Sequence, residues 1–190
     1  MSSFSQKKTP EEVGLELFRR FERSADRISH ALSSIENKEA FFQDFNAKKL
    51  FTELIILVYI GQRLALQIMH EKEPSETDLT TRREICNALD RHVLEFFGNS
   101  KEFNNLLDKR GEQYYKLVIS HLDEIHKLKW KEFSLALNLK FEQFCRGGGG
   151  ENDPLIISDA FSNIPLWILS AEYWENGFIE TAAYIDEQGL

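Results

Sequence analysis

Carboxylates and imidazoles are the side chains that could hold a metal ion or a small ligand, and three stand out: Glu53, His92 and His121. His92 falls on the apolar stripe of a predicted helix, seven residues after Ile85 and four before Phe96. We expect its ring to face the interior with Glu53 as a partner, although a histidine in such a place is more often a core residue than a ligand. These three residues are therefore candidates for a ligand or metal site in the core.

The densest run of potential metal ligands is found near position 121, and its members are His121, Asp123, Glu124 and His126. Residues five apart on a helix differ by about 140° in direction, so His121 and His126 flank opposite edges of the predicted buried stripe. The Glu-x-x-His motifs of di-metal carboxylate bundles do not occur in the chain. We therefore expect no resident metal or other cofactor.

Motifs for nucleophilic catalysis are missing as well. The chain has no Gly-x-Ser-x-Gly turn, and we expect Cys86 and Cys145 to be buried free thiols, because neither has a histidine beside it in sequence. The glycine run at 147–150 is followed by acidic residues and by no lysine, so it predicts a linker rather than a phosphate-binding loop. We assign no catalytic residue. Enzymatic activity stays open, and the pattern favours a protein without it.

Acidic and aromatic side chains gather at the C-terminal end of the chain. Residues 147–190 carry eight acidic and no basic side chains, which accounts for the whole net charge of -8. Aromatic residues are enriched at interface centres, and charge of one sign attracts a partner of the opposite sign. This combination predicts an interaction surface, and its candidate residues are Phe161, Trp167, Glu172, Tyr173, Trp174 and Glu175. The alternative is that the rings dock on the protein core while the acids face water.

Helices must position all of these residues, because the chain has only 4 prolines and 10 glycines and lacks the turn-dense spacing of β-sandwiches and barrels. Thr9 and Glu12, with a proline between them, form a helix start with a capping box. From Leu50 onward, apolar residues alternate at steps of four and three. The helix near 47–72 is apolar nearly all round its middle, so we expect it at the centre of a bundle. Gly61 in its seam would let another backbone approach closely.

Further signals divide the remaining sequence. Gly98 is a predicted left-handed helix stop, and Gly111 and Gly177 are predicted breaks. After Gly111 the buried seam is predicted to begin at Tyr115. A step of five residues before Trp130 breaks the apolar phase, which predicts a bend, a rotation of the buried face or two helices. The sequence therefore predicts an all-α, single-domain bundle of about seven or eight helices.

The predicted domain spans 1–190, with a main bundle at 1–146, a linker at 147–153 and an acidic, aromatic-rich helical segment at 154–190 packed on the bundle. The first residues lack the apolar run of a secretory signal. The apolar stretch at 50–69 contains charged and amide side chains, so we expect a cytoplasmic protein without a membrane span. We expect no binding to nucleic acid, because phosphate groups are bound by clustered lysine and arginine side chains and this chain is acidic.

These observations predict a helical protein-interaction or regulatory module. It would act through an apolar and acidic surface and bind a protein partner or a second copy of itself. The alternative is a helical-bundle enzyme or sensor that binds a small ligand or metal in its core, near Glu53, His92 or His121.

Overall fold

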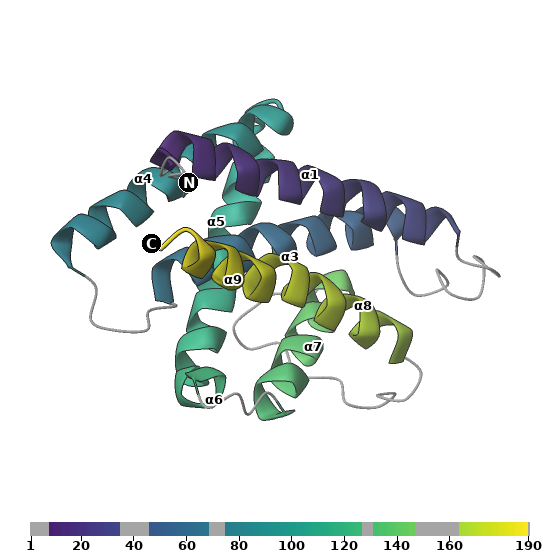
Figure 1. Ribbon diagram of the computed structural model, residues 1–190. Helices are drawn as coiled ribbons and strands as arrows, with labels where there is room; N and C mark the ends of the chain where they lie inside the picture. The colour runs from purple at the N-terminus through teal and green to yellow at the C-terminus, as the bar shows by residue number, and fades with distance from the viewer. Residues whose placement is uncertain (1–7, 35–45, 69–74, 127–130, 147–163, 190) are drawn as a thin grey trace, which may run out of the picture.

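The computed structural model describes residues 8–34, 46–68, 75–126, 131–146 and 164–189, with positions 126, 131 and 164–167 described by their backbone only. The elements in these ranges are all helical, which confirms the predicted all-α bundle (Figure 1). In chain order they are α1 (Pro10–Ser33), α3 (Ala47–Ile68), α4 (Glu76–Phe96), α5 (Lys101–Ser120), α6 (Leu122–His126), α7 (Lys131–Cys145), α8 (Ile164–Trp174), the π-helical turn η1 (Glu175–Ile179) and α9 (Glu180–Glu187). The predicted linker at 147–153 lies outside the described residues.

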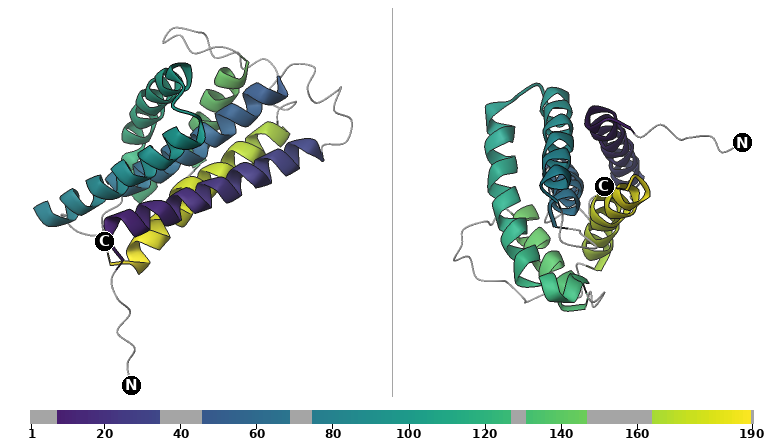
Figure 2. Two further views of the ribbon diagram at one scale, coloured as in Figure 1. Left: turned by 90° about the horizontal axis from the view of Figure 1, so that it is seen from above. Right: turned by 60° about the vertical axis from the view of Figure 1, so that its left-hand side comes forward.

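Helix α3 runs through the middle of the bundle. From residue 53 to residue 66 every residue except Arg63 is buried, which confirms the predicted central apolar helix. The right-hand view of Figure 2 shows α5, α6 and α7 on one side of α3, and α1, α8 and α9 on the other. Among the described residues, α3 is also the one helix long and apolar enough to cross a membrane, and 72% of its apolar window is buried inside the bundle. Neighbours on all sides explain why α3 needs no polar face.

Side chains at the helix ends confirm the predicted helix start at Thr9 and the predicted helix stop at Gly98. The Thr9 hydroxyl accepts a hydrogen bond from the Glu12 amide at 3.2 Å, and the Glu12 carboxylate accepts one from the Thr9 amide at 2.8 Å. Ser100 caps α5 by accepting a hydrogen bond from the amide of Phe103. These contacts pair amides that a helix N-terminus leaves without partners. Gly98, between α4 and α5, has a φ of 66°, so the predicted left-handed stop is present.

Two glycines bring α3 into close contact with the C-terminal helices. A Cβ on Gly61 would lie 3.0 Å from the backbone nitrogen of Phe178, and a Cβ on Gly177 would overlap the carbonyl oxygen of Val58. The close approach predicted at Gly61 is therefore confirmed. The predicted break at Gly177 is wrong, because the chain stays helical from α8 through η1 into α9. Gly177 is needed for packing on α3 and does not end a helix.

The predicted break at Gly111 is also wrong, since α5 continues through this residue. Among the described residues, nothing lies within 4 Å of a Cβ placed on Gly111, so none of them makes a close contact that requires glycine there. The phase break before Trp130 agrees with the alternative of two helices, because α6 ends at His126 and α7 begins at Lys131. The residues between them, 127–130, lie outside the described part of the chain.

These two kinds of glycine predict opposite effects on stability. Gly177→Ala should lower the free energy of unfolding by about 2 kcal/mol or more, because the added methyl overlaps the backbone of Val58 in a packed core. Gly111→Ala should raise it by up to about 1 kcal/mol, because alanine favours the helix and meets open space. Urea denaturation followed by circular dichroism measures both values. An unchanged stability of the Gly177→Ala protein would contradict the packing of η1 on α3.

Candidate functional site

The aromatic rings predicted to form a C-terminal interaction surface lie in the core wherever the structure describes them. Tyr173 and Trp174 are only 2% and 3% exposed, and Trp174 stacks on Phe178 with ring centroids 4.9 Å apart. The prediction of exposed rings is therefore wrong for Tyr173 and Trp174. The physical reason is that α8 and η1 pack against α3 and use these rings to close the core.

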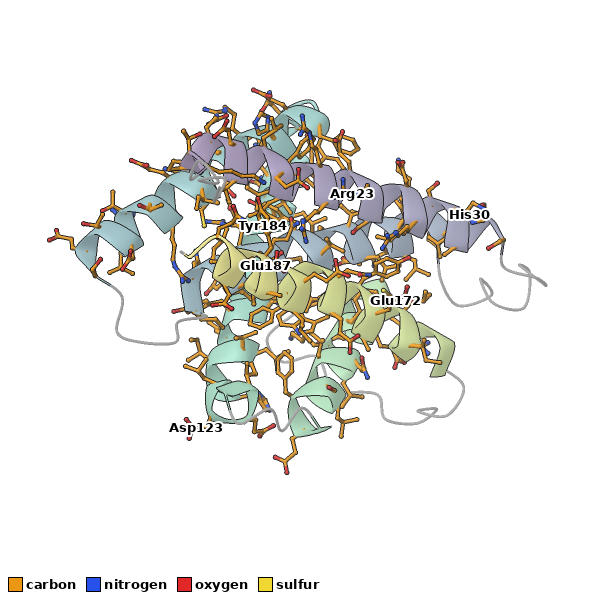
Figure 3. The ribbon with its side chains drawn as sticks, in the orientation of Figure 1. Arg23, His30, Asp123, Glu172, Tyr184 and Glu187 are labelled. Atoms are coloured by element: carbon orange, nitrogen blue, oxygen red, sulfur yellow. The ribbon has the colours of Figure 1, made fainter. Side chains whose placement is uncertain are left out.

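Acidic side chains of the same segment do face the solvent. Glu172 and Glu175 are both exposed, and Figure 3 shows Glu172 on α8. Ile168 is 61% exposed on the same helix. The side chains of Phe161 and Trp167 lie outside the described residues. Without Tyr173 and Trp174, the described part of this face lacks the large aromatic anchors on which interface energies usually depend.

Glu53 forms a buried ion pair with Arg110 instead of the predicted contact with His92. The Arg110 guanidinium donates from Nη2 to Oε1 at 2.7 Å and from Nε to Oε2 at 2.9 Å. Arg110 is 5% exposed and Glu53 is 2% exposed. The guanidinium also lies 3.6 Å from the centre of the Phe144 ring. A two-point pair of this kind holds α5 against α3 in one orientation, so Glu53 is not free to bind a ligand.

His92 lies between α4 and α1 and is only partly buried. Its ring stacks on Phe18 with centroids 5.4 Å apart, and its Nε2 atom is 3.4 Å from Oε1 of Glu11. Ile85 is buried as the predicted stripe of α4 requires, but near the end of the helix Val93 takes the buried position and Phe96 is 49% exposed. The expectation that His92 faces the interior beside Glu53 is wrong, because its contacts join α4 to α1.

His121 lies just beyond the end of α5. Its Nδ1 atom is 2.9 Å from the carbonyl oxygen of Leu117, and its ring meets the Phe133 ring at a centroid distance of 5.9 Å. Glu53, His92 and His121 thus have separate sets of partners, and the fold does not bring them together into one site. Within the described ranges, no group of three His, Cys, Asp or Glu residues is arranged to hold a metal ion.

Both cysteines are free and buried, as the sequence predicts. Burial raises the pKa of the Cys86 thiol to about 11 and raises the pKa of Cys145 as well. Each thiol therefore stays protonated at neutral pH and is a poor nucleophile. Neither cysteine is suited to covalent catalysis.

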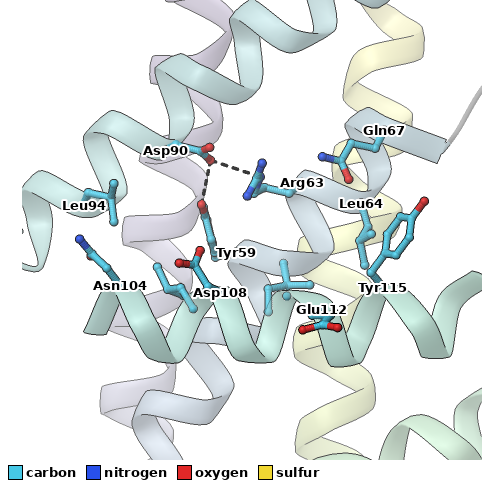
Figure 4. Close-up of a pocket in the computed structure, with 13 residues that line it drawn as sticks. Tyr59, Arg63, Leu64, Gln67, Asp90, Leu94, Asn104, Asp108, Glu112 and Tyr115 are labelled. Atoms are coloured by element: carbon cyan, nitrogen blue, oxygen red, sulfur yellow. Dashed lines mark hydrogen bonds and ion pairs between the residues drawn. The ribbon is translucent and has the colours of Figure 1, made fainter. Parts of the chain in front are cut away.

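A groove of about 490 Å³ lies between α3, α4 and α5 and collects polar side chains from all three helices (Figure 4). It is lined by Tyr59, Ile60, Arg63, Leu64 and Gln67 of α3, Asp90 and Leu94 of α4, and Asn104, Leu107, Asp108, Gly111, Glu112 and Tyr115 of α5. We name it the acidic groove, because three carboxylates line it against one guanidinium. The ion pair of Glu53 and the turn at Gly98 position the helices that form it.

Asp90 is the centre of a hydrogen-bonded group on the inner side of the acidic groove. Its Oδ1 atom accepts a hydrogen bond from the Tyr59 hydroxyl at 2.8 Å and lies 3.3 Å from Nε of Arg63 (Figure 4). Burial raises the pKa of the Asp90 carboxyl, whereas Arg63 and the Tyr59 hydrogen bond lower it. The net pKa is raised in the fold, so the stability linked to Asp90 is greatest in acid and is lost as the carboxyl ionises. Additional positive charge in the groove would favour the ionised form.

The outer edge of the acidic groove carries two further carboxylates. Asp108 and Glu112 are exposed and lie one turn apart on α5. Lys116 is 2.9 Å from Glu112, but its side chain is 59% exposed and that of Glu112 67%, so this pair is weak and exchangeable. The amide oxygen of Asn104 is buried in the groove wall and has no hydrogen-bond partner within the described part of the chain. The exposed carboxylates of Asp108 and Glu112 therefore offer acceptors to a cationic group that carries N–H donors.

None of the groove residues is among the sequence-predicted site residues, although α5 carries a signal for them. The predicted start of the seam at Tyr115 is wrong, since Tyr114 is fully buried and Tyr115 is 46% exposed. With this register, Asp108, Glu112 and Tyr115 share one face of α5, next to a glycine inside the helix. An exposed acidic and aromatic face beside an unexplained helical glycine is the pattern that indicates the groove.

No protein-family model matches this chain, no curated protein matches its sequence, and no solved structure matches its fold.

The buried ion pair predicts a large loss of stability when one partner becomes neutral. Glu53→Gln should lower the free energy of unfolding by about 3–5 kcal/mol, because Arg110 keeps its charge in the core without an anionic partner. Glu16→Gln is the matched control, since it removes partly exposed pairs with arginines of α1 and should cost about 1 kcal/mol or less. Denaturant unfolding at neutral pH compares the two. Equal, small losses would show that the Glu53 pair does not anchor α5.

Proposed function

We propose that this protein is a helical interaction module that binds a basic segment of a partner protein in the acidic groove. The observation that carries the proposal is the charge of the groove: three carboxylates face one guanidinium, that of Arg63, which already pairs with Asp90. Lysine or arginine side chains of a partner would neutralise Asp108 and Glu112. Complementary charge of this kind supports the rate and the specificity of association.

Apolar contacts are available beside these carboxylates. Tyr115 is 46% exposed at the groove, and Ile119 is 42% exposed one turn further along α5. A tyrosine suits an interface, because its ring buries a large apolar area while its hydroxyl keeps a hydrogen bond. The proposal keeps the predicted combination of an apolar and an acidic surface and moves it from the C-terminal helices to α5.

The shape of the groove supports a partner protein over a small ligand. A volume of about 490 Å³ would suit a small molecule. However, Asp108, Glu112 and Tyr115 at the rim are exposed, whereas small-molecule sites enclose most of the surface of their ligand. The alternative of a ligand or metal in the core has no support from its three predicted residues, which have other partners. The expected cytoplasmic location and self-association stay predictions.

A microarray of short synthetic peptides with varied charge tests the proposal with defined probes. The wild-type protein should bind peptides that combine lysine or arginine with apolar residues. The double variant Asp108→Lys/Glu112→Lys should bind them at least about tenfold more weakly, because two attractive contacts become repulsive. Glu180→Lys/Glu187→Lys changes the net charge equally at exposed positions of α9, on the other side of α3, and should keep its binding.

Two results on the peptide array would contradict the proposed function. Equal losses in both double variants would mean that only the net charge of the protein matters, as in non-specific attraction. Unchanged binding by the Asp108→Lys/Glu112→Lys protein would mean that the peptides bind elsewhere.

A further inference from the structure

Helix α5 presents an exposed stripe that begins in the acidic groove and runs past it. Its members follow each other at steps of four, three and four residues: Asp108, Glu112, Tyr115 and Ile119. All four side chains are exposed, so none of the described helices covers them. At 1.5 Å per residue the stripe extends about 16 Å. It carries carboxylates at one end and apolar side chains at the other.

The walls of the groove favour a helical occupant over an extended one. Away from their ends, α3, α4 and α5 pair their backbone amides and carbonyls within each helix, so these walls offer no strand edge to an extended peptide. A helical segment arrives with its own backbone hydrogen bonds already made. The steps of four and three on α5 also match the ridges and grooves of a second helix laid beside it.

Space and hydrogen-bond acceptors lie beside the acidic end of the stripe. Gly111 leaves the surface of α5 open, because no atom of the described residues lies within 4 Å of a Cβ placed there. Glycine is unfavourable inside a helix relative to alanine, and none of the described residues makes a packing contact that explains it at this position. The exposed carboxylates of Asp108 and Glu112 lie beside this space, and Asp90 lies on the inner side of the groove. A cationic side chain that enters above Gly111 would therefore be close to the exposed carboxylates of α5.

We propose that the occupant of the acidic groove is an amphipathic helix of a partner protein that lies along α5. This inference rests on the proposed function and adds the form of the partner. Lysine or arginine side chains one turn apart meet Asp108 and Glu112, and apolar side chains further along the same face pack against Tyr115 and Ile119. The opposite character of the two ends of the stripe sets the direction in which the partner lies.

Peptides that differ only in pattern and shape test this form of the partner. The first probe carries two lysines one turn apart and two leucines further along the same face, with a covalent staple on its far face to hold it helical, and is made in both chain directions. The second has the same residues in an order that puts lysines and leucines on different faces. The third keeps the pattern but contains prolines that prevent a helix. Fluorescence anisotropy with the full chain measures the Kd of each probe.

The patterned helix should bind at least about tenfold more tightly than the other two probes in one of its directions, because only this probe reaches both ends of the stripe. Tyr115→Ala should weaken its binding by about tenfold, since tyrosine is a common interface anchor. Leu135→Ala is the matched control: it truncates a side chain that is 49% exposed on α7 and should leave the Kd unchanged.

The possible failures are distinguishable. Equal affinity for the proline-containing probe, with binding still lost in Asp108→Lys/Glu112→Lys, would overturn the helical partner and leave the groove as the binding site. Unchanged affinity of that double variant for every probe would overturn the proposed function itself. Spermidine is the small-amine probe, and displacement of the patterned helix by spermidine at equal concentration would assign the groove to a small amine and overturn the inference.

Discussion

The buried ion pair between Glu53 and Arg110 determines how the acidic groove is built. Both side chains are enclosed, and two hydrogen bonds tie α5 to α3 at one rotation about its axis. Residues two apart on a helix point about 200° apart, so directing Arg110 inward turns Asp108 and Glu112 outward. Phe144 lies against the guanidinium and extends the anchor to α7. One interior contact therefore sets the charge that the opposite face of α5 presents to the solvent.

Local features of this fold could be predicted from the sequence, because each depends on residues within about one turn of helix. The Thr9 cap and the left-handed stop at Gly98 are features of this kind. Gly111 and Gly177 could not be predicted in the same way. A glycine that a close contact requires, or one that leaves space open, looks in sequence like a glycine that ends a helix.

The candidate site could not be predicted, because it forms only where three helices meet. Tyr59 and Asp90 are 31 residues apart, and no periodicity within one helix indicates that they will share a hydrogen bond. The prediction that the C-terminal rings are exposed failed for a related physical reason. Protein cores and partner surfaces use the same aromatic residues, and only the packing of Tyr173 and Trp174 near α3 decides between the two uses.

Backbone amide chemical shifts of the isotope-labelled protein, recorded while the stapled lysine-bearing helix is added, test the central claim most directly. Binding in the acidic groove predicts the largest changes on α5 between positions 104 and 119, together with changes at Arg63 and Asp90 on the facing helices. The largest changes on α8 and η1, around Glu172 and Glu175, or changes spread evenly over the bundle, would contradict the claim.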